Sequence, residues 1–219
     1  MGSAIQEMRA KIAEAGALML ARNLTDLGGG NISVRVDGVV CITPRYAGSR
    51  YQWRLRPEQV IVCDLEGNQL EGEGEISREA KVHFKLLNEF TDGKAVIHAH
   101  PRNVLVFCAA RRSIPPVLEY TVKFGEVKVI SYAPGHSTQL AEKVAEALRG
   151  QEERVRKQAA AVIAPWHGLF VLGKDLEAAV DAVERIEVNA RCILLGRILA
   201  AGGLDDEPAA LAAAVAASK

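Results

Sequence analysis

Apolar and polar residues alternate along the chain with two different periods. Residues 5–23 repeat apolar side chains at helical intervals, which predicts an amphipathic helix. Residues 31–43 carry two short apolar runs separated by Asp37 and Gly38, a pair typical of a tight turn, and predict a β-hairpin. Residues 59–72 repeat this pattern, with a strand followed by a turn at Gly67 and Asn68. The first third of the chain is therefore expected to be one helix followed by strands.

The rest of the chain mixes both periods. The segment 77–90 predicts a helix with Ser77 as its N-cap, because a serine hydroxyl can accept a hydrogen bond from the first turn. Further helices are expected at 103–112, 138–149 and 176–201, and strands at 94–100, 127–133 and, as a pair, 159–173. Because the strands lie mostly in the middle with helices around them, the order favours an α/β sheet covered by helices over a pure sandwich or bundle.

Length and composition fit one domain. The chain has 219 residues, of which 49% are hydrophobic and 25% charged, and no Ser, Gly or Pro tract divides it. We therefore expect a single domain over residues 1–219, with the Ala-rich segment 203–219 as a docked or frayed tail. The four cysteines lie far apart in the sequence, so reduced thiols are expected.

Charge and the first helix limit the classes of partner. The 27 basic and 27 acidic residues balance, so no overall field favours nucleic acid or anionic lipid. The N-terminal segment lacks the uninterrupted apolar core of a signal peptide or membrane span. These features predict a cytoplasmic protein with no nucleic-acid or membrane partner.

Two histidines stand close together at the end of the strand 94–100. His98 and His100 are two residues apart, so their side chains project from the same face of the strand. Two neutral imidazoles on one face form a ready pair of metal ligands, although two half-buried polar residues before Pro101 would give the same pattern. His167, in an apolar run at an expected strand end, would complete the three-ligand set typical of catalytic zinc.

Two further segments could bind or transform a substrate. Glu79 and His83 are four residues apart and share a helix face, while Ser77 and Arg78 lie at the expected helix start, where free N–H groups favour an anion. Taken alone, Glu79 and His83 fit an ordinary first-turn acid and a histidine at the core edge better than a functional pair. Upstream, glycines 28–30 lead into a strand and could present N–H groups to a phosphate or form a structural turn.

Four motifs in one order are similar to those of a known family. Gly-Gly-Asn-x-Ser at 29–33, Ser-x-Glu at 77–79, His-x-His-Pro at 98–101 and His-Gly-Leu at 167–169 resemble the class II aldolase/adducin family over residues 5–200. The resemblance implies a three-layer α/β/α sandwich around a mainly antiparallel sheet. It also implies a homotetramer with active sites between subunits, and a divalent metal, usually Zn²⁺ with Mn²⁺ or Co²⁺ as alternatives.

The resemblance also implies roles for individual residues. His98, His100 and His167 correspond to the metal ligands, and Glu79 to the catalytic carboxylate; His83 matches a histidine one turn beyond it. Tyr120 falls where one family member has a tyrosine that reaches a neighbouring subunit's site and protonates the departing aldehyde. The implied activity is reversible, metal-dependent cleavage of a ketose 1-phosphate to dihydroxyacetone phosphate and an aldehyde, through an enediolate that the metal stabilises.

The expected phosphate pocket departs from the family pattern. Where a family aldolase has Thr-Pro-Thr-Gly, this chain reads Thr-Pro-Arg-Tyr in a longer segment with Arg45, Arg50 and Arg54. Arginine binds phosphate or carboxylate through two parallel hydrogen bonds, so another acid is an alternative substrate. Arg50 and Arg54 also fit solvated surface positions. The residues assigned to the substrate and its phosphate are Gly30, Asn31, Thr43, Arg45, Ser77 and Arg78.

Other activities occur on the implied scaffold. Family epimerases carry aspartate at the position of Glu79, which favours aldol cleavage here. A sugar-phosphate 4-epimerase, a dehydratase and a sugar-acid-phosphate decarboxylase stay as alternatives. A non-catalytic adducin-like binding module is a more remote one, because all three histidines and the glutamate are present.

Overall fold

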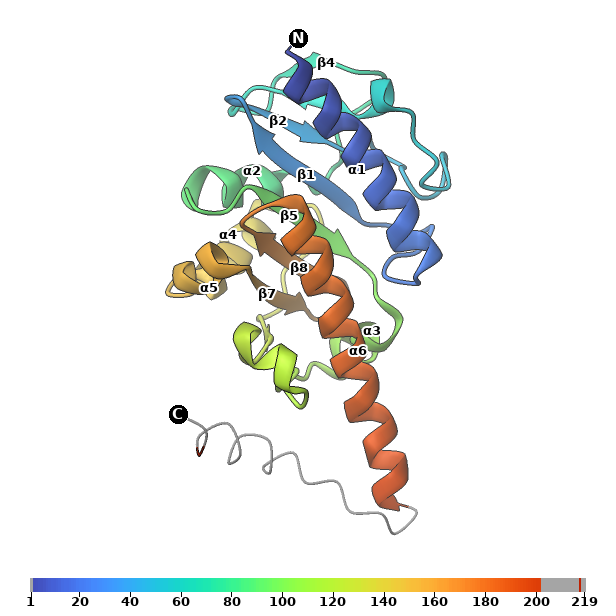
Figure 1. Ribbon diagram of the computed structural model, residues 1–219, viewed down its shortest axis with the longest axis vertical. Coiled ribbons are helices and arrows are strands. Elements are labelled where there is room, and N and C mark those ends of the chain that lie inside the picture. The colour runs from blue at the N-terminus through green and yellow to red at the C-terminus, as the bar shows by residue number, and fades with distance from the viewer. Residues whose placement is uncertain (1, 202–216, 218–219) are drawn as a thin grey trace.

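The computed structural model describes residues 2–201 and residue 217, and its centre is one sheet of eight strands (Figure 1). The strands are β1 (Asn31–Val36), β2 (Val39–Ile42), β3 (Ile61–Cys63), β4 (Gln69–Glu71), β5 (Ala95–Ala99), β6 (Lys128–Val129), β7 (Ala159–Ala164) and β8 (Gly168–Gly173). Their order across the sheet is β4-β3-β2-β1-β5-β8-β7-β6. All neighbouring pairs are antiparallel except β6 and β7.

Helices cover both faces of this sheet. The α-helices are α1 (Ser3–Ala21), α2 (Ala80–Glu89), α3 (Arg102–Ala110), α4 (Thr138–Leu148), α5 (Glu152–Lys157) and α6 (Leu176–Ala201), and two 3-10 helices, η1 (Pro57–Gln59) and η2 (Glu119–Phe124), join them. In Figure 1, α1 and α6 lie in front of the sheet, and α2 and α4 lie behind it. The expected three-layer α/β/α sandwich with a mainly antiparallel sheet is confirmed.

Alternation along the strands produces two hydrophobic cores. On β5, Ile97 packs with α1, α3 and α6, whereas its neighbour Val96 packs with α2, α4 and α5. All five residues of β5 and all six of β8 are buried, as expected for central strands covered on both sides. His98 shares the α2 side of β5 with Val96, since residues two apart point to the same face.

The turn and helix predictions hold in most places. Asp37 and Gly38 both have positive φ, 48° and 79°, and form the turn between β1 and β2. The prediction of Ser77 as N-cap was wrong. The helix begins at Ala80 with Glu79 in the N-cap position, and Ser77 lies two residues earlier, where its hydroxyl accepts a hydrogen bond from the Glu79 N–H at 3.3 Å.

Other differences concern short elements. The expected strand 127–133 is reduced to β6, because beyond Val129 the chain leaves the edge of the sheet, after one further bond from Ile130 N–H to the Ile163 carbonyl. The sequence pattern did not indicate α5, which is one and a half turns long. The segment 203–219 lies outside the described residues, apart from residue 217.

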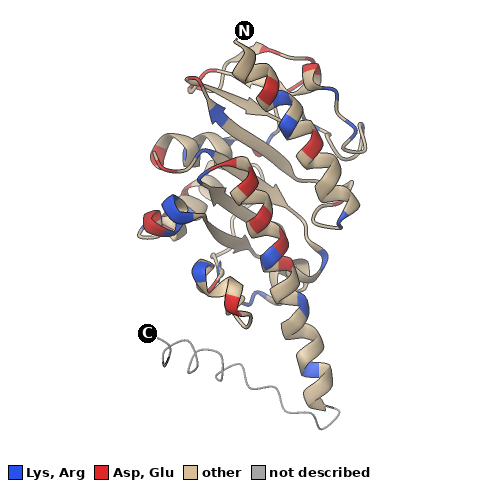
Figure 2. Cartoon of the chain, in the orientation of Figure 1, with Lys and Arg blue, Asp and Glu red and all other residues tan. Residues whose placement is uncertain are grey.

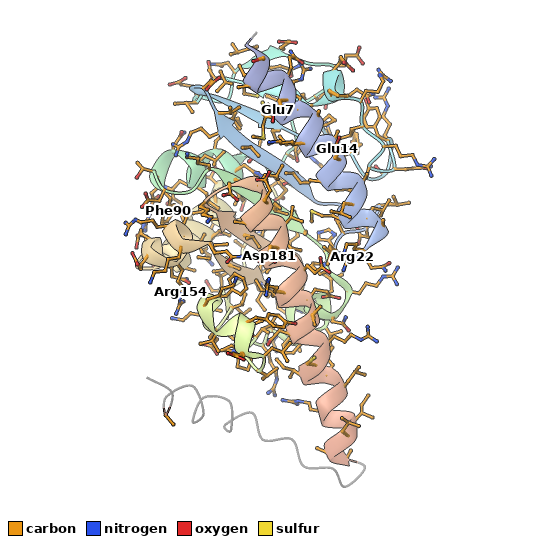
Figure 3. The ribbon with its side chains drawn as sticks, viewed as in Figure 1. Glu7, Glu14, Arg22, Phe90, Arg154 and Asp181 are labelled. Carbon is orange, nitrogen blue, oxygen red and sulfur yellow. The ribbon has the colours of Figure 1, made fainter. Side chains whose placement is uncertain are left out.

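The outer surface is polar over much of the front layer. Glu7 and Glu14 are exposed on α1 (Figure 3), and acidic and basic side chains are interspersed there and on the first turns of α6 (Figure 2). The last turns of α6 differ, because Leu195, Ile198 and Leu199 are exposed. Within residues 2–201, no helix is both long enough and apolar enough to cross a membrane.

Candidate metal centre and active site

Three histidines meet at one end of the central strands. His98 lies on β5, His100 follows the end of that strand, and His167 lies in the turn between β7 and β8. One nitrogen from each ring lies within 4.8 Å of the other two, and the His98 and His100 Nε2 atoms are 3.2 Å apart. The antiparallel pairing of β5 with β8 brings these segments together, with His98 opposite Phe170.

Hydrogen bonds on the far side of two rings define which nitrogen carries hydrogen. His98 Nδ1 lies 3.1 Å from the Leu169 carbonyl oxygen, which can only accept. His100 Nδ1 lies 3.2 Å from Asp26 Oδ1, a carboxylate oxygen. Both rings therefore donate from Nδ1 and present the Nε2 lone pair to the centre. Two lone pairs 3.2 Å apart repel each other unless a proton or a cation lies between them.

Burial keeps the imidazoles of His98 and His167 neutral. It lowers the pKa of His98 well below 6.5, and the neighbouring His100 and His167 lower it further. Burial also lowers the pKa of His167, which the charge of Glu79 partly opposes. Neutral imidazole is the form that binds a metal ion.

The spacing of the donors fits a divalent cation. Ligands about 2.1 Å from a tetrahedral Zn²⁺ ion lie about 3.4 Å from each other, close to the separation of the two Nε2 atoms. Imidazole nitrogens suit zinc and neighbouring transition metals, and three of them leave a position for substrate. The residues present therefore could hold such an ion.

Two glycines make room for the rings. A Cβ atom on Gly29 would lie 2.5 Å from His100 Cε1, and one on Gly168 would lie 2.8 Å from His100 Cδ2 and 2.9 Å from His98 Cε1. Such distances are shorter than van der Waals contact, so any side chain would displace the imidazoles. These positions require glycine because the backbone approaches the centre closely.

Glu79 brings a buried carboxylate to the same place. Only 3% of the residue is exposed. Oε1 accepts a hydrogen bond from the His136 backbone N–H at 2.7 Å, contacts His136 Nδ1, and lies 4.0 Å from His167 Nε2. Oε2 is buried and has no hydrogen-bond partner among the described residues. A buried oxygen without a partner is unusual and commonly marks a functional group.

A chain of directed hydrogen bonds forms one wall of the site. Burial lowers the pKa of His83 to about 3, so the ring is neutral. His83 Nε2 donates to Asn31 Oδ1, and Nδ1 accepts from the Ser33 hydroxyl, which lies 2.7 Å away. Asn31 Nδ2 then donates to Ser77 Oγ at 3.0 Å. Since Ser77 Oγ also accepts from the Glu79 N–H, its own hydrogen is left to donate elsewhere.

These groups line a cavity of about 290 Å³. Of the residues predicted for substrate or phosphate, five line it: Gly30, Asn31, Arg45, Ser77 and Arg78. Arg45 pairs with Glu75, whereas Arg78 is exposed and forms no ion pair within residues 2–201. The N–H groups of Gly28 and Gly29 are not free for phosphate, because Asp26 Oδ1 accepts both at 2.8 and 3.0 Å.

Two predicted residues lie away from the cavity. Thr43 is fully buried, and its hydroxyl accepts a hydrogen bond from the Ile32 N–H at 3.1 Å, so it does not face the cavity. Its prediction as a substrate ligand was wrong for this reason. Tyr120 lies on η2, 40% exposed, beneath the Arg185 guanidinium at 4.9 Å, and it does not line the cavity of its own chain.

His136 and Asp26 take part in the site and were not predicted. His136 lines the cavity from the turn before α4, and Asp26 orients His100 from the loop after α1. The sequence signals were weak. His136 follows a Pro-Gly pair beyond the expected strand 127–133 and fits an ordinary turn, and an aspartate ahead of glycines is typical of an ordinary loop.

Comparison with known proteins agrees with the fold. Residues 10–194 match the family described as Class II Aldolase and Adducin N-terminal domain. The chain belongs to this family.

The individual relatives are named for different activities. The chain is 29% identical over 191 residues to a 5-deoxy-D-ribulose 1-phosphate aldolase from Bacillus thuringiensis, covering 85% of this chain and 84% of that one. It is 32% identical over 186 residues to a 3-oxo-tetronate 4-phosphate decarboxylase from Haemophilus influenzae, covering 81% and 82%. A solved L-fuculose 1-phosphate aldolase superposes with a TM-score of 0.78 at 26% identity, covering 91% and 89%.

Proposed function

We propose that this protein is a zinc-dependent aldolase that reversibly cleaves a ketose 1-phosphate to dihydroxyacetone phosphate and an aldehyde. The observation that carries the proposal is the convergence of three imidazoles and the buried carboxylate of Glu79 on one cavity. Mn²⁺ and Co²⁺ remain alternatives to Zn²⁺, since imidazole binds all three. The aldolases among its relatives support the choice of reaction.

His98, His100 and His167 would hold the ion. A bound divalent cation supplies positive charge that withdraws electrons from the substrate carbonyl during cleavage. The chain's own contribution is to keep the rings of His98 and His167 neutral by burial and to aim the Nε2 atoms of His98 and His100 inward. No lysine Schiff base is then needed.

We assign to Glu79 the transfer of a proton to and from a carbon atom of the substrate. After the carbon–carbon bond breaks, the carbon that keeps the electron pair takes a proton from the Glu79 carboxyl group, and in condensation the carboxylate removes it. The carboxylate suits this work by its place, because it is buried beside the cavity and its Oε2 has no hydrogen-bond partner among the described residues.

The phosphate would lie against the wall of the cavity that contains Ser77. The free hydrogen of the Ser77 hydroxyl and the guanidinium of Arg78 provide donors without acceptors, as an anion requires. Gly30, Asn31 and Arg45 shape the same wall.

The assembly we propose is a homotetramer with active sites between subunits, in the cytoplasm. Support comes from the exposed apolar residues Leu195, Ile198 and Leu199 on α6 and Val122 beside Tyr120, which a subunit contact would bury. In this arrangement Tyr120 acts in the neighbouring subunit's site, where it exchanges a proton with the oxygen of the aldehyde.

The test is release of dihydroxyacetone phosphate from a panel of ketose 1-phosphates. Wild-type protein should release it, chelator should abolish release, added Zn²⁺ should restore it, and Glu79→Gln should lower the rate by about 100-fold or more, because it removes the proton-transfer group. Glu14→Gln makes the same chemical change on the exposed face of α1, outside the cavity, and as the matched control should leave the rate within about twofold. Chelator-resistant release, or equal rates for Glu79→Gln and wild type, would contradict the proposal.

A second candidate is decarboxylation of a phosphorylated 3-oxo sugar acid. The cavity contains two guanidinium groups, Arg45 and Arg78, which could bind a phosphate and a carboxylate, and one relative is named for such a reaction. Release of CO₂ from 3-oxo-tetronate 4-phosphate, with no dihydroxyacetone phosphate from any ketose, would favour it.

A further inference from the structure

His136 reaches the site from a strained turn. It lies between β6 and α4 with φ of 65°, a backbone conformation that residues other than glycine adopt rarely. Its neighbour Ser137 caps α4 by accepting the Leu140 N–H at 3.0 Å. The turn is thereby anchored on one side by the helix and on the other by Glu79.

Both donors of His136 bind the same carboxylate oxygen. The backbone N–H donates to Glu79 Oε1 at 2.7 Å, and Nδ1 of the ring contacts that oxygen as well. Rotation of the carboxylate would break both contacts. Oε2 consequently stays in one position, buried and without a partner among the described residues, beside a cavity that both residues line.

We propose that His136 is a positioning residue for Glu79, which makes Oε2 the atom that exchanges a proton with the substrate. In the cleavage direction the Oε2–H bond breaks as the carbanion's electron pair forms the new C–H bond, and in condensation both changes reverse. The inference rests on the proposed function. It assigns a role to the ring of His136, because any residue other than proline would supply the backbone N–H but only a ring or amide donor would supply the second contact.

The test compares two substitutions of His136 in metal-loaded protein. His136→Ala removes the ring donor, whereas His136→Asn keeps an N–H near the position of Nδ1 and tolerates positive φ. We expect His136→Ala to lower kcat by about 10- to 100-fold with KM changed less than about threefold, and His136→Asn to recover most of kcat. Unchanged kcat in His136→Ala, or equal loss in both variants, would overturn the inference.

Ser137→Ala is the matched control. It removes the cap of α4 next to His136 and should lower the Tm while leaving kcat unchanged. A loss of kcat in this variant equal to that of His136→Ala would show that disturbance of the turn, and not loss of the ring donor, is responsible, and would overturn the inference.

A second measurement does not depend on turnover. In metal-free protein, the Tm changes of His136→Ala and Glu79→Ala should be non-additive in the double variant, because each removes the contact between the His136 ring and the carboxylate. Additive Tm changes would show that the His136 ring and the Glu79 carboxylate do not interact, and would overturn the inference. No turnover by the wild type on any ketose 1-phosphate would overturn the proposed function and the proton-transfer role with it. Turnover by a wild type whose His136→Ala variant is unimpaired would overturn the positioning role alone.

Discussion

The orientation of His100 depends on one carboxylate that lies outside the metal centre. Asp26 Oδ1 receives the N–H groups of Gly28 and Gly29, which hold it opposite His100 Nδ1 at 3.2 Å. A carboxylate behind a ligating histidine orients the ring and raises its basicity as a ligand. Half of the Asp26 side chain is exposed, so solvent screens its charge. Its main effect on His100 is to hold the ring in one orientation.

We therefore predict that Asp26→Asn weakens Zn²⁺ binding by about 10- to 100-fold, because a neutral amide is a poorer acceptor for the His100 N–H. Competition titration against a chromophoric chelator measures this. Asp37→Asn makes the same chemical change in the exposed β1–β2 turn and should leave the affinity unchanged. Equal affinities for Asp26→Asn and wild type would refute the role of Asp26.

Strand register and helix packing place the polar wall of the site. In the pairing of β1 with β5, Asn31 lies opposite His98, so both point to the side of the sheet that α2 covers. His83 on α2, which packs on this face of the sheet, forms hydrogen bonds with Ser33 and Asn31. A one-residue slip in this register would move Asn31 to the other face and leave His83 buried without partners.

The buried His83 should make stability depend on pH. The pKa of His83 is about 3 in the folded protein and 6.5 in the unfolded chain. Its contribution to the free energy of unfolding is therefore complete above pH 6.5 and is lost as the pH falls towards 3. In metal-free protein, His83→Gln should reduce the slope of unfolding free energy against pH by up to about 1.4 kcal/mol per unit in this window. Glutamine keeps a donor for Asn31. Urea unfolding at several pH values measures the slopes, and identical slopes would exclude this role.

At the scale of the whole molecule, the strand order decides which distant segments become neighbours. Because β8 lies between β5 and β7, residues about seventy apart in sequence meet at one end of the sheet. The same topology leaves Tyr120 on η2, packed near α6 and outside its own cavity. Its proposed role therefore requires another subunit.

Mixing inactive variants tests this role. Tyr120→Phe should lower the aldolase rate by about 10-fold or more, and Glu79→Gln should be nearly inactive. If Tyr120 acts across the interface, tetramers reassembled from both variants contain some sites with an intact Glu79 and an intact Tyr120, and activity rises above the mean of the two. Light scattering on the same samples reports the oligomeric state. Activity equal to the mean in confirmed mixed oligomers would contradict action across subunits.

Local physical chemistry made much of the fold predictable. Most of the helices and strands follow from apolar periodicity, with α5 and the length of β6 as exceptions, and the turn at Asp37 and Gly38 follows from the residues that accept positive φ. His98 and His100 share a face because the side-chain period of a strand is two. These features depend only on neighbours in the sequence, so the sequence by itself determined them.

Tertiary structure alone decided which segments share the site. The periodicity of the sequence does not determine the distance from His167 to His98. The pairing of β5 with β8 brings the two side chains together. Thr43 turned inward because its hydroxyl bonds a neighbouring strand, whereas His136 entered the site because a strained turn brings it to Glu79. Such contacts depend on packing between distant elements, which periodicity in the sequence does not encode.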